Sequence, residues 1–301
     1  MKEQHLFRIA GFRIAISFES TEKNSVQLLP SYSAFTDNAD DGGEFLFTLH
    51  VDDNLHASRE RELIRKFDTG NGDTLVYLLP DGGYQYIIRN IHGHDCCLLK
   101  TNKDFSRCEC ALNGTTAMRA FGLNDAVMLI FAFRASFYDT LLIHASCVRH
   151  GGLSYPFIAK SGTGKSTHSS LWLKHIPDTD LINDDNPIVR VIEGRVYLFG
   201  SPWSGKTPCY RNVKTRLGAI TKIERAPANR IERLRTIQAF ATLLPSCSSM
   251  KWDSTIYNNI CDTITRIIES VPVYTMHCLP DEDAAHVCHD AITAGGNGEE
   301  A

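Results

Sequence analysis

The strongest chemical signal in the sequence is the glycine-rich stretch Ser161-Gly162-Thr163-Gly164-Lys165-Ser166-Thr167. In a loop of this composition the glycines let successive backbone N–H groups point at phosphate oxygens, and a following helix adds the positive end of its dipole. Lys165 is then expected against the β- and γ-phosphates, and the hydroxyl of Ser166 on Mg²⁺. Ala159 stands where the strict pattern has glycine. The stretch predicts a nucleotide-binding loop that ends a strand and begins a helix.

A pair of carboxylates, Asp184-Asp185, follows this loop, with Asp185 lying 18 residues beyond Thr167. A carboxylate at the end of a strand can hold Mg²⁺ or accept the proton of an attacking hydroxyl. The alternative is a solvated turn, because the run from Asn183 to Pro187 has the composition of one. Beside a nucleotide-binding loop, we favour the catalytic and metal-binding interpretation.

His144 is the third candidate, although a single histidine in a strand is ordinarily a core or surface residue. Its expected strand, 141–149, is the hairpin partner of strand 153–159, which leads into the glycine-rich stretch. A turn at 150–152 pairs His144 with a residue near 158 or 159. We therefore expect this imidazole close to the phosphates.

The elements that must position these residues follow from the apolar patterning. Residues 1 to about 115 are β-rich, and a buried helix over 122–139, capped by Asn124, comes next. The predicted domains are a β-rich N-terminal domain of unknown role over 1–118, a catalytic domain over 119–294 and a disordered tail over 295–301. The expected strands are 14–18, 44–51, 74–79, 84–89, 141–149, 153–159, 180–183, 187–192, 196–199 and 271–276, and the later expected helices are 165–175, 231–244, 254–270 and 281–293.

Composition excludes several classes of function. The 301 residues carry a net charge of −4 and are 43 % hydrophobic, so nothing favours nucleic acid or an anionic membrane as a partner. The apolar run 126–133 is too short to span a bilayer, and the first residues do not resemble a signal peptide. Ten cysteines without a CxxC pair are expected as free thiols in the cytoplasm.

Two weaker groups of residues have a mainly structural interpretation. The first is a histidine–cysteine cluster made of His92, His94, Cys96, Cys97, Cys108 and Cys110. This cluster could bind zinc, but the spacing of its residues fits neither a zinc finger nor a zinc ribbon. The second is the basic run from Arg225 to Arg235, expected as a solvated helix face with an ion pair between Glu232 and Arg235. A phosphate- or partner-binding face is the alternative for this run.

Together these residues resemble the HPr kinase/phosphorylase and phosphoenolpyruvate carboxykinase group of P-loop proteins. The resemblance covers about 140–293. It is carried by His144-Ala145-Ser146, by 159–167, by Leu181-Ile182-Asn183-Asp184-Asp185, by Gly200-Ser201-Pro202-Trp203 and by Val271-Pro272-Val273-Tyr274. It implies Asp185 as the metal-binding and proton-accepting carboxylate, Asp184 as its assistant, and His144 near the metal and γ-phosphate. Lys206 departs from the resemblance, because many HPr-kinase-like proteins carry an acidic residue there.

The sequence therefore predicts a β-rich N-terminal domain followed along the chain by an α/β (α+β mixed-sheet) P-loop kinase domain. With Mg²⁺ or Mn²⁺ it would transfer the γ-phosphoryl group of ATP, or of GTP, to a hydroxyl of a protein, peptide or metabolite. The alternatives are a non-catalytic ATP-binding regulator and a carboxykinase-like lyase, which the chain length disfavours. The resemblance also implies self-association, since HPr kinases are oligomers.

Overall fold

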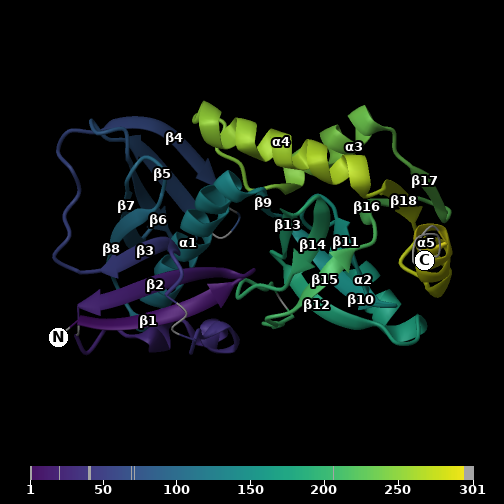
Figure 1. Ribbon diagram of the computed structural model, residues 1–301, viewed down its shortest axis with the longest axis horizontal. Helices are drawn as coiled ribbons and strands as arrows, with labels where there is room; N and C mark the ends of the chain where they lie inside the picture. Colours follow the sequence, from purple (N-terminus) through teal and green to yellow (C-terminus); the bar gives the residue numbers. More distant parts are fainter. Residues whose placement is uncertain are drawn as a thin grey trace. The chain divides into compact units, whose positions relative to one another are not determined.

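The computed structural model describes residues 2–19, 21–39, 42–68, 70, 72–205 and 207–294 (Figure 1). The chain divides into two compact units, Met1–Ala135 and Ser136–Ala301. Each unit contains a sheet with both parallel and antiparallel strand pairs, so the fold is α+β with two mixed sheets. The predicted tail and Lys206 lie outside the described residues.

The first unit is built on a sheet in the order β1-β2-β3-β8-β7-β6-β5-β4. The β2–β3 and β3–β8 pairs are parallel and the other pairs antiparallel. Its strands and short 3₁₀ helices are β1 (Lys2–Ile9), β2 (Phe12–Glu19), η1 (Val26–Leu28), η2 (Pro30–Phe35), β3 (Phe45–Val51), β4 (Glu62–Asp68), β5 (Asp73–Leu78), β6 (Tyr84–Arg89), β7 (Asp95–Thr101) and β8 (Arg107–Leu112).

Helix α1 (Thr116–Ala135) packs on strands β3, β6, β7 and β8 of this sheet. It begins six residues before the expected 122–139 helix, so Asn124 is an interior residue and not its cap. The helix buries its apolar face on the first sheet, and the division between units therefore falls after Ala135, not between residues 118 and 119. Among the described residues, 116–138 is long and apolar enough to cross a membrane, and 56 % of its most apolar window is buried.

The second unit contains a branched sheet, and β11 is the strand at which it branches. Strand β11 pairs antiparallel with β10, parallel with β15 at its start and parallel with β16 at its end. The strands and the short 3₁₀ helices of this unit are η3 (Ser136–Tyr138), β9 (Thr140–Leu142), β10 (Ala145–His150), β11 (Leu153–Ile158), β12 (Asp180–Asp185), β13 (Ile188–Ile192), β14 (Arg195–Phe199), β15 (Lys214–Leu217), β16 (Ile220–Arg225), β17 (Arg230–Arg233), η4 (Leu244–Ser246) and β18 (Val273–Cys278).

Helices α2 (Lys165–His175) and α5 (Glu282–Thr293) bury an apolar cluster against β11, β16 and β18. Trp172 of α2 lies at the centre of this cluster and is fully buried. Helix α4 (Ser254–Ser270) turns a stripe of isoleucines inward, as its periodicity predicts, and contacts β9, β13 and β14. These three helices confirm the expected ranges to within a residue.

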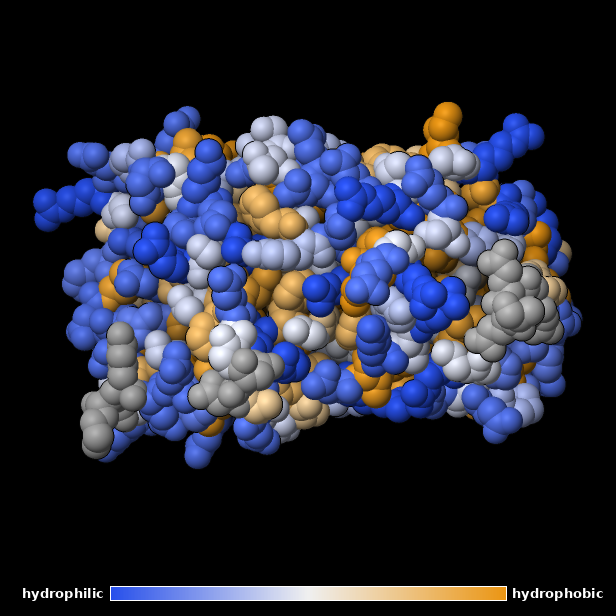
Figure 2. Space-filling model, in the orientation of Figure 1, coloured by the Kyte–Doolittle hydropathy of each residue, from blue (hydrophilic) through white to orange (hydrophobic). Residues whose placement is uncertain are grey.

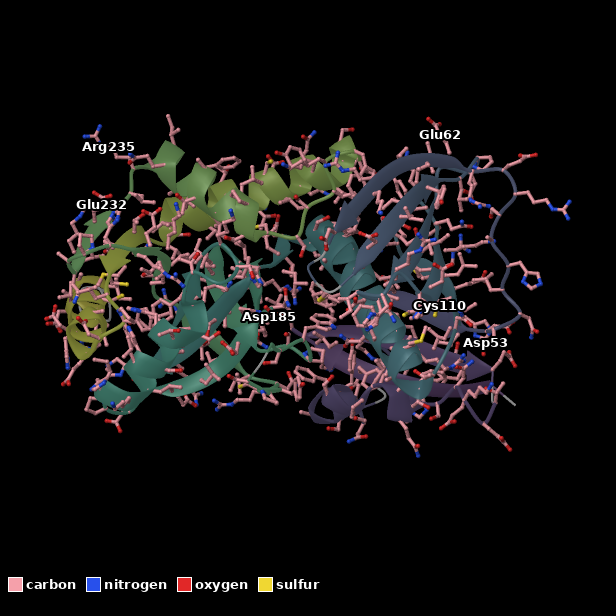
Figure 3. The ribbon with its side chains drawn as sticks, turned by 180° about the vertical axis from the view of Figure 1, so that it is seen from behind. Asp53, Glu62, Cys110, Asp185, Glu232 and Arg235 are labelled. Carbon is pink, nitrogen blue, oxygen red and sulfur yellow. The ribbon has the colours of Figure 1, made fainter. Side chains whose placement is uncertain are left out.

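The expected helix over 231–244 is wrong in its first half. Residues 230–233 form β17, an edge strand antiparallel to β18, and only α3 (Thr236–Leu243) is helical. Glu232 consequently contacts His277 and not Arg235. Figure 3 shows Glu232 and Arg235 close to this edge and away from Asp185. The charged sequence resembles a solvated helix, but pairing with β18 places Ile231 against the apolar cluster.

Exposed hydrophobic side chains are scattered over both units. Figure 2 shows orange patches between hydrophilic residues on the face drawn there. Ile91 and Ile237 are the most exposed of the large hydrophobic residues described, at 69 % and 84 %. Isolated apolar residues of this kind are normal on a protein surface.

We expect Gly122→Ala to destabilise the first unit, although alanine is the better helix former by about 1 kcal/mol. An added Cβ would lie 2.9 Å from the carbonyl oxygen of Cys96 and from the Cβ of Cys97, so helix and sheet would have to separate. Overpacking of this kind costs about 1–3 kcal/mol. The change in the free energy of unfolding is measured by urea unfolding followed by circular dichroism. The control Ala117→Gly, at an exposed position of α1, reports the effect of helix propensity alone.

A Gly122→Ala protein that is more stable than the wild type would contradict the close approach of helix and sheet.

Candidate functional site

The glycine-rich stretch forms a loop, residues 159–164, between the end of β11 and the first residue of α2. Gly162 and Gly164 have φ angles of 77° and 126°, in the region that side chains disfavour. Gly164 is the N-cap of α2, so no side chain caps the first N–H groups of the helix. The N-terminus of α2 is therefore open to an anion at the mouth of the loop.

His144 lies where the expected 141–149 strand is interrupted, between β9 and β10. Its backbone N–H donates to the carbonyl of Ser246 at 2.7 Å, which turns it out of the ladder. Its Nε2 lies 2.7 Å from the Nζ of Lys165, and its Nδ1 lies 3.0 Å from the Oδ1 of Asp185. Because an ammonium group only donates, Nε2 accepts from Lys165 and Nδ1–H donates to Asp185. One imidazole thus joins the first residue of α2 to the last residue of β12.

Burial lowers the pKa of Lys165, while the negative charges of Asp185 and Asp184 act in the opposite direction. Its Nζ is also 3.4 Å from the carbonyl oxygen of Ala159. The ammonium group is therefore held at the opening of the 159–164 loop, with protein acceptors on two sides. It is placed to meet an incoming anion.

Asp184 and Asp185 point to opposite faces of β12 because neighbouring residues of a strand alternate. Asp184 is only 6 % exposed, and its Oδ1 accepts from the hydroxyl of Ser146 at 2.7 Å. Ser169 of α2 donates in turn to Ser146 at 2.6 Å. The second oxygen of Asp184, Oδ2, is buried without a protein partner. A buried carboxylate oxygen left in this state is suited to a water molecule or a cation.

The end of β12 is fixed by residues that the sequence analysis did not single out as functional. The side-chain oxygen of Asn183 accepts from the backbone N–H groups of Asp185 and Asn186, both at 2.9 Å. Its amide donates to Ser201 and to the carbonyl of Trp203. The Gly-Ser-Pro-Trp segment thus holds the Asp-Asp pair in place. Only the family resemblance had drawn attention to that segment.

Arg225, which the sequence analysis placed in a solvated helix face, contacts the loop instead. It ends β16, which runs parallel to β11, and is not part of the expected solvated helix. Its guanidinium donates to the carbonyl oxygens of Thr163 and Gly162 at 3.1 and 2.7 Å. Because the peptide bond is planar and trans, the N–H of Gly164 points in the direction opposite to the Thr163 carbonyl, away from Arg225.

The oxygen donors present suit Mg²⁺, which prefers carboxylates, hydroxyls and water. The hydroxyl of Ser166 in the first turn of α2 and the carboxylate of Asp185 are the residues that could hold it, with the buried oxygen of Asp184 behind them. The side chains of the histidine–cysteine group at 92–110 do not meet at one metal-binding point. Its four cysteines are buried free thiols in β7 and β8, and no three His, Cys, Asp or Glu side chains among the described residues could hold a metal ion.

Comparisons with known proteins place the chain in no family. No family model matches the chain, and no curated protein matches it. Among solved structures, 88 chains match. One is the HPr(Ser) kinase/phosphatase from Coxiella burnetii, with 9 % identity, a TM-score of 0.30, and coverage of 52 % of this chain and 95 % of that chain. The resemblance is weak.

We expect Arg225→Ala to loosen the 159–164 loop. Two hydrogen bonds from a charged donor are lost, and at a solvent-exposed position this is worth about 1 kcal/mol. Amide hydrogen exchange of the loop should then be about fivefold faster. The matched control is Arg230→Ala, because Arg230 is exposed and its ion pair is with Glu232, 3.9 Å away, and not with the loop. Equal loop exchange in the two variants would show that Arg225 does not restrain the loop.

His168 of α2 makes the second unit sensitive to acid. Burial lowers its pKa from 6.5 to about 4, and its Nε2 accepts from the indole N–H of Trp172. The unfolded chain gains a proton below pH 6.5, whereas the folded chain gains it only near pH 4. Stability is therefore lost as the pH falls through this window, by roughly 3 kcal/mol in all.

We expect His168→Gln to reduce this loss, because glutamine can also accept from Trp172 but does not titrate. Urea unfolding of the two proteins at several pH values between 7 and 4 tests it, as the other titrating groups are common to both. Parallel stability curves would exclude His168 as the source.

Proposed function

We propose that the second unit is a nucleotide-dependent phosphotransferase that acts with Mg²⁺ on a hydroxyl acceptor. The proposal rests on one observation, the bridge from Lys165 through His144 to Asp185 at the opening of the 159–164 loop. A cation for phosphate and a carboxylate for a hydroxyl proton are thereby held within one hydrogen-bonded chain. The P-loop kinase type suggested by the sequence is part of the same proposal.

The nucleotide phosphates would bind at the N-terminus of α2, against the amides of the loop and the ammonium of Lys165. This stretch is Ser161-Gly162-Thr163-Gly164-Lys165-Ser166-Thr167. Mg²⁺, when bound at Ser166 and Asp185, would neutralise charge on the β- and γ-phosphoryl oxygens. The ammonium of Lys165 would stabilise the same developing charge.

In the transfer step an acceptor O–H attacks the γ-phosphorus, the bond to the β–γ bridging oxygen breaks, and the nucleoside diphosphate leaves. Asp185 takes the acceptor proton. Its Oδ1 already accepts from His144 and its Oδ2 from the amide of Asn186 at 2.7 Å, so its orientation is set before the substrate arrives. Asp184 and Ser146 support the strand end from the buried face.

We expect Asp185→Asn to lower phosphoryl transfer by roughly 100-fold or more, because the amide cannot accept the proton. The matched control is Asp180→Asn, the same substitution at the other end of β12, where the carboxylate pairs with Arg149 and Arg211. Purified proteins would receive γ-labelled ATP and Mg²⁺, with acceptors supplied as protein and small-molecule fractions of a cell extract. Nucleotide affinity would be measured in parallel.

Label that wild type and Asp180→Asn transfer, and Asp185→Asn does not, supports the proposal and identifies the class of acceptor. Undiminished transfer by Asp185→Asn would remove its assigned role. Nucleotide binding without transfer to either fraction would instead favour the non-catalytic regulator. A protein that binds no nucleotide would overturn the proposal as a whole.

A further inference from the structure

A pair of histidines, His150 and His289, lies at the other end of β11 from the 159–164 loop. His150 ends β10, and the hairpin turn that follows uses Gly151 and Gly152, with φ angles of 56° and 79°. His289 lies on α5, beside the buried Cys288. The two Nε2 atoms are 3.3 Å apart, and the ring centroids are 4.9 Å apart with their planes inclined at 78°. The six residues of β11 separate this pair from the loop by about 20 Å.

Both Nδ1 atoms are occupied by acceptors. The Nδ1 of His150 lies 3.1 Å from the carbonyl oxygen of Pro177, and the Nδ1 of His289 lies 3.0 Å from the Oδ1 of Asp290. Neither oxygen can donate, so each Nδ1 carries a hydrogen. The hydroxyl of Thr179, 3.4 Å from the same Nδ1 of His150, does not alter this, because the carbonyl is nearer. In the neutral rings, both Nε2 atoms therefore present lone pairs.

Two lone pairs 3.3 Å apart cannot form a hydrogen bond with each other. A cation between the two nitrogens would accept both lone pairs. The separation fits two ligands of one tetrahedral ion, since Zn–N bonds of about 2.0–2.1 Å place the nitrogens about 3.4 Å apart. The Nδ1 contacts are also those of metal-bound histidines, which donate their other N–H to a carbonyl or a carboxylate.

We propose that His150 and His289 form a binding site for a borderline transition-metal cation such as Zn²⁺, with water completing its coordination. Both side chains are partly exposed, so ion and water can reach them. The pair supplies two protein ligands, and no set of three exists among the described residues. The bound ion would join α5 to the β10–β11 hairpin.

The site has a built-in reporter in Trp172. Its ring centroid is 5.5 Å from that of His289 and 6.4 Å from that of His150. A paramagnetic ion such as Ni²⁺ bound between the two histidines quenches this indole, and Zn²⁺ reverses the quenching by displacement. Excess Mg²⁺ keeps oxygen-rich sites filled throughout.

The test uses full-length protein without a purification tag, dialysed against chelator and then titrated with Zn²⁺ by calorimetry and with Ni²⁺ by fluorescence. We expect one Zn²⁺ per chain and a higher Tm with the metal. His150→Gln and His289→Gln should each weaken binding by roughly tenfold or more. The matched control, His286→Gln, alters an exposed histidine of the same helix that pairs only weakly with Glu282 at 3.7 Å.

Wild-type Zn²⁺ affinity in both His150→Gln and His289→Gln, or no Zn²⁺ binding to the wild type, would overturn the site. The Tm of each variant without metal shows that it folds. Because no nucleotide is present, the result is independent of phosphoryl transfer.

Discussion

The candidate site depends on the register of one strand, β10, between its two antiparallel neighbours. Ala145 pairs with Ile158 of β11 on one side and with Asp185 of β12 on the other. One residue before Ala145 is His144, and one residue after Ile158 the 159–164 loop begins. Three chain segments that are distant in sequence therefore meet at the same end of three neighbouring strands, β10, β11 and β12. A shift of one residue would turn each of these side chains to the opposite face.

The same register determines how the charges are compensated. Asp185 faces His144 and Lys165 at a partly exposed opening, where water and ions can complete its contacts. Asp184 points the other way, where its Oδ1 accepts from the neutral hydroxyl of Ser146, which in turn accepts from the hydroxyl of Ser169. A buried carboxylate beside hydroxyls alone retains a strong demand for positive charge. This demand is the physical reason to expect a cation at this strand end.

Local patterns in the sequence were sufficient for features that depend on near neighbours. The hairpin at Gly151-Gly152 predicted the position of His144, and the isoleucine stripe predicted α4 to the residue. Features that depend on distant partners were not accessible. The helix that packs on the first sheet was assigned to the second domain, and β17 was mistaken for a helix because nothing in its own residues indicates pairing with β18. For the same reason, Arg225 could not be connected with the loop, 62 residues away.

Helix α2 runs alongside β11 and has contacts near both ends of that strand. It begins at Lys165, and Trp172, two turns later, contacts both His150 and His289. The helix is about 16 Å long and packs on a dense apolar cluster along its length. Its packing against α5 and the hairpin at one end and its first residue at the loop therefore belong to one rigid element of secondary structure. The packing that buries Trp172 makes the position of Lys165 a property of the whole unit and not of its loop alone.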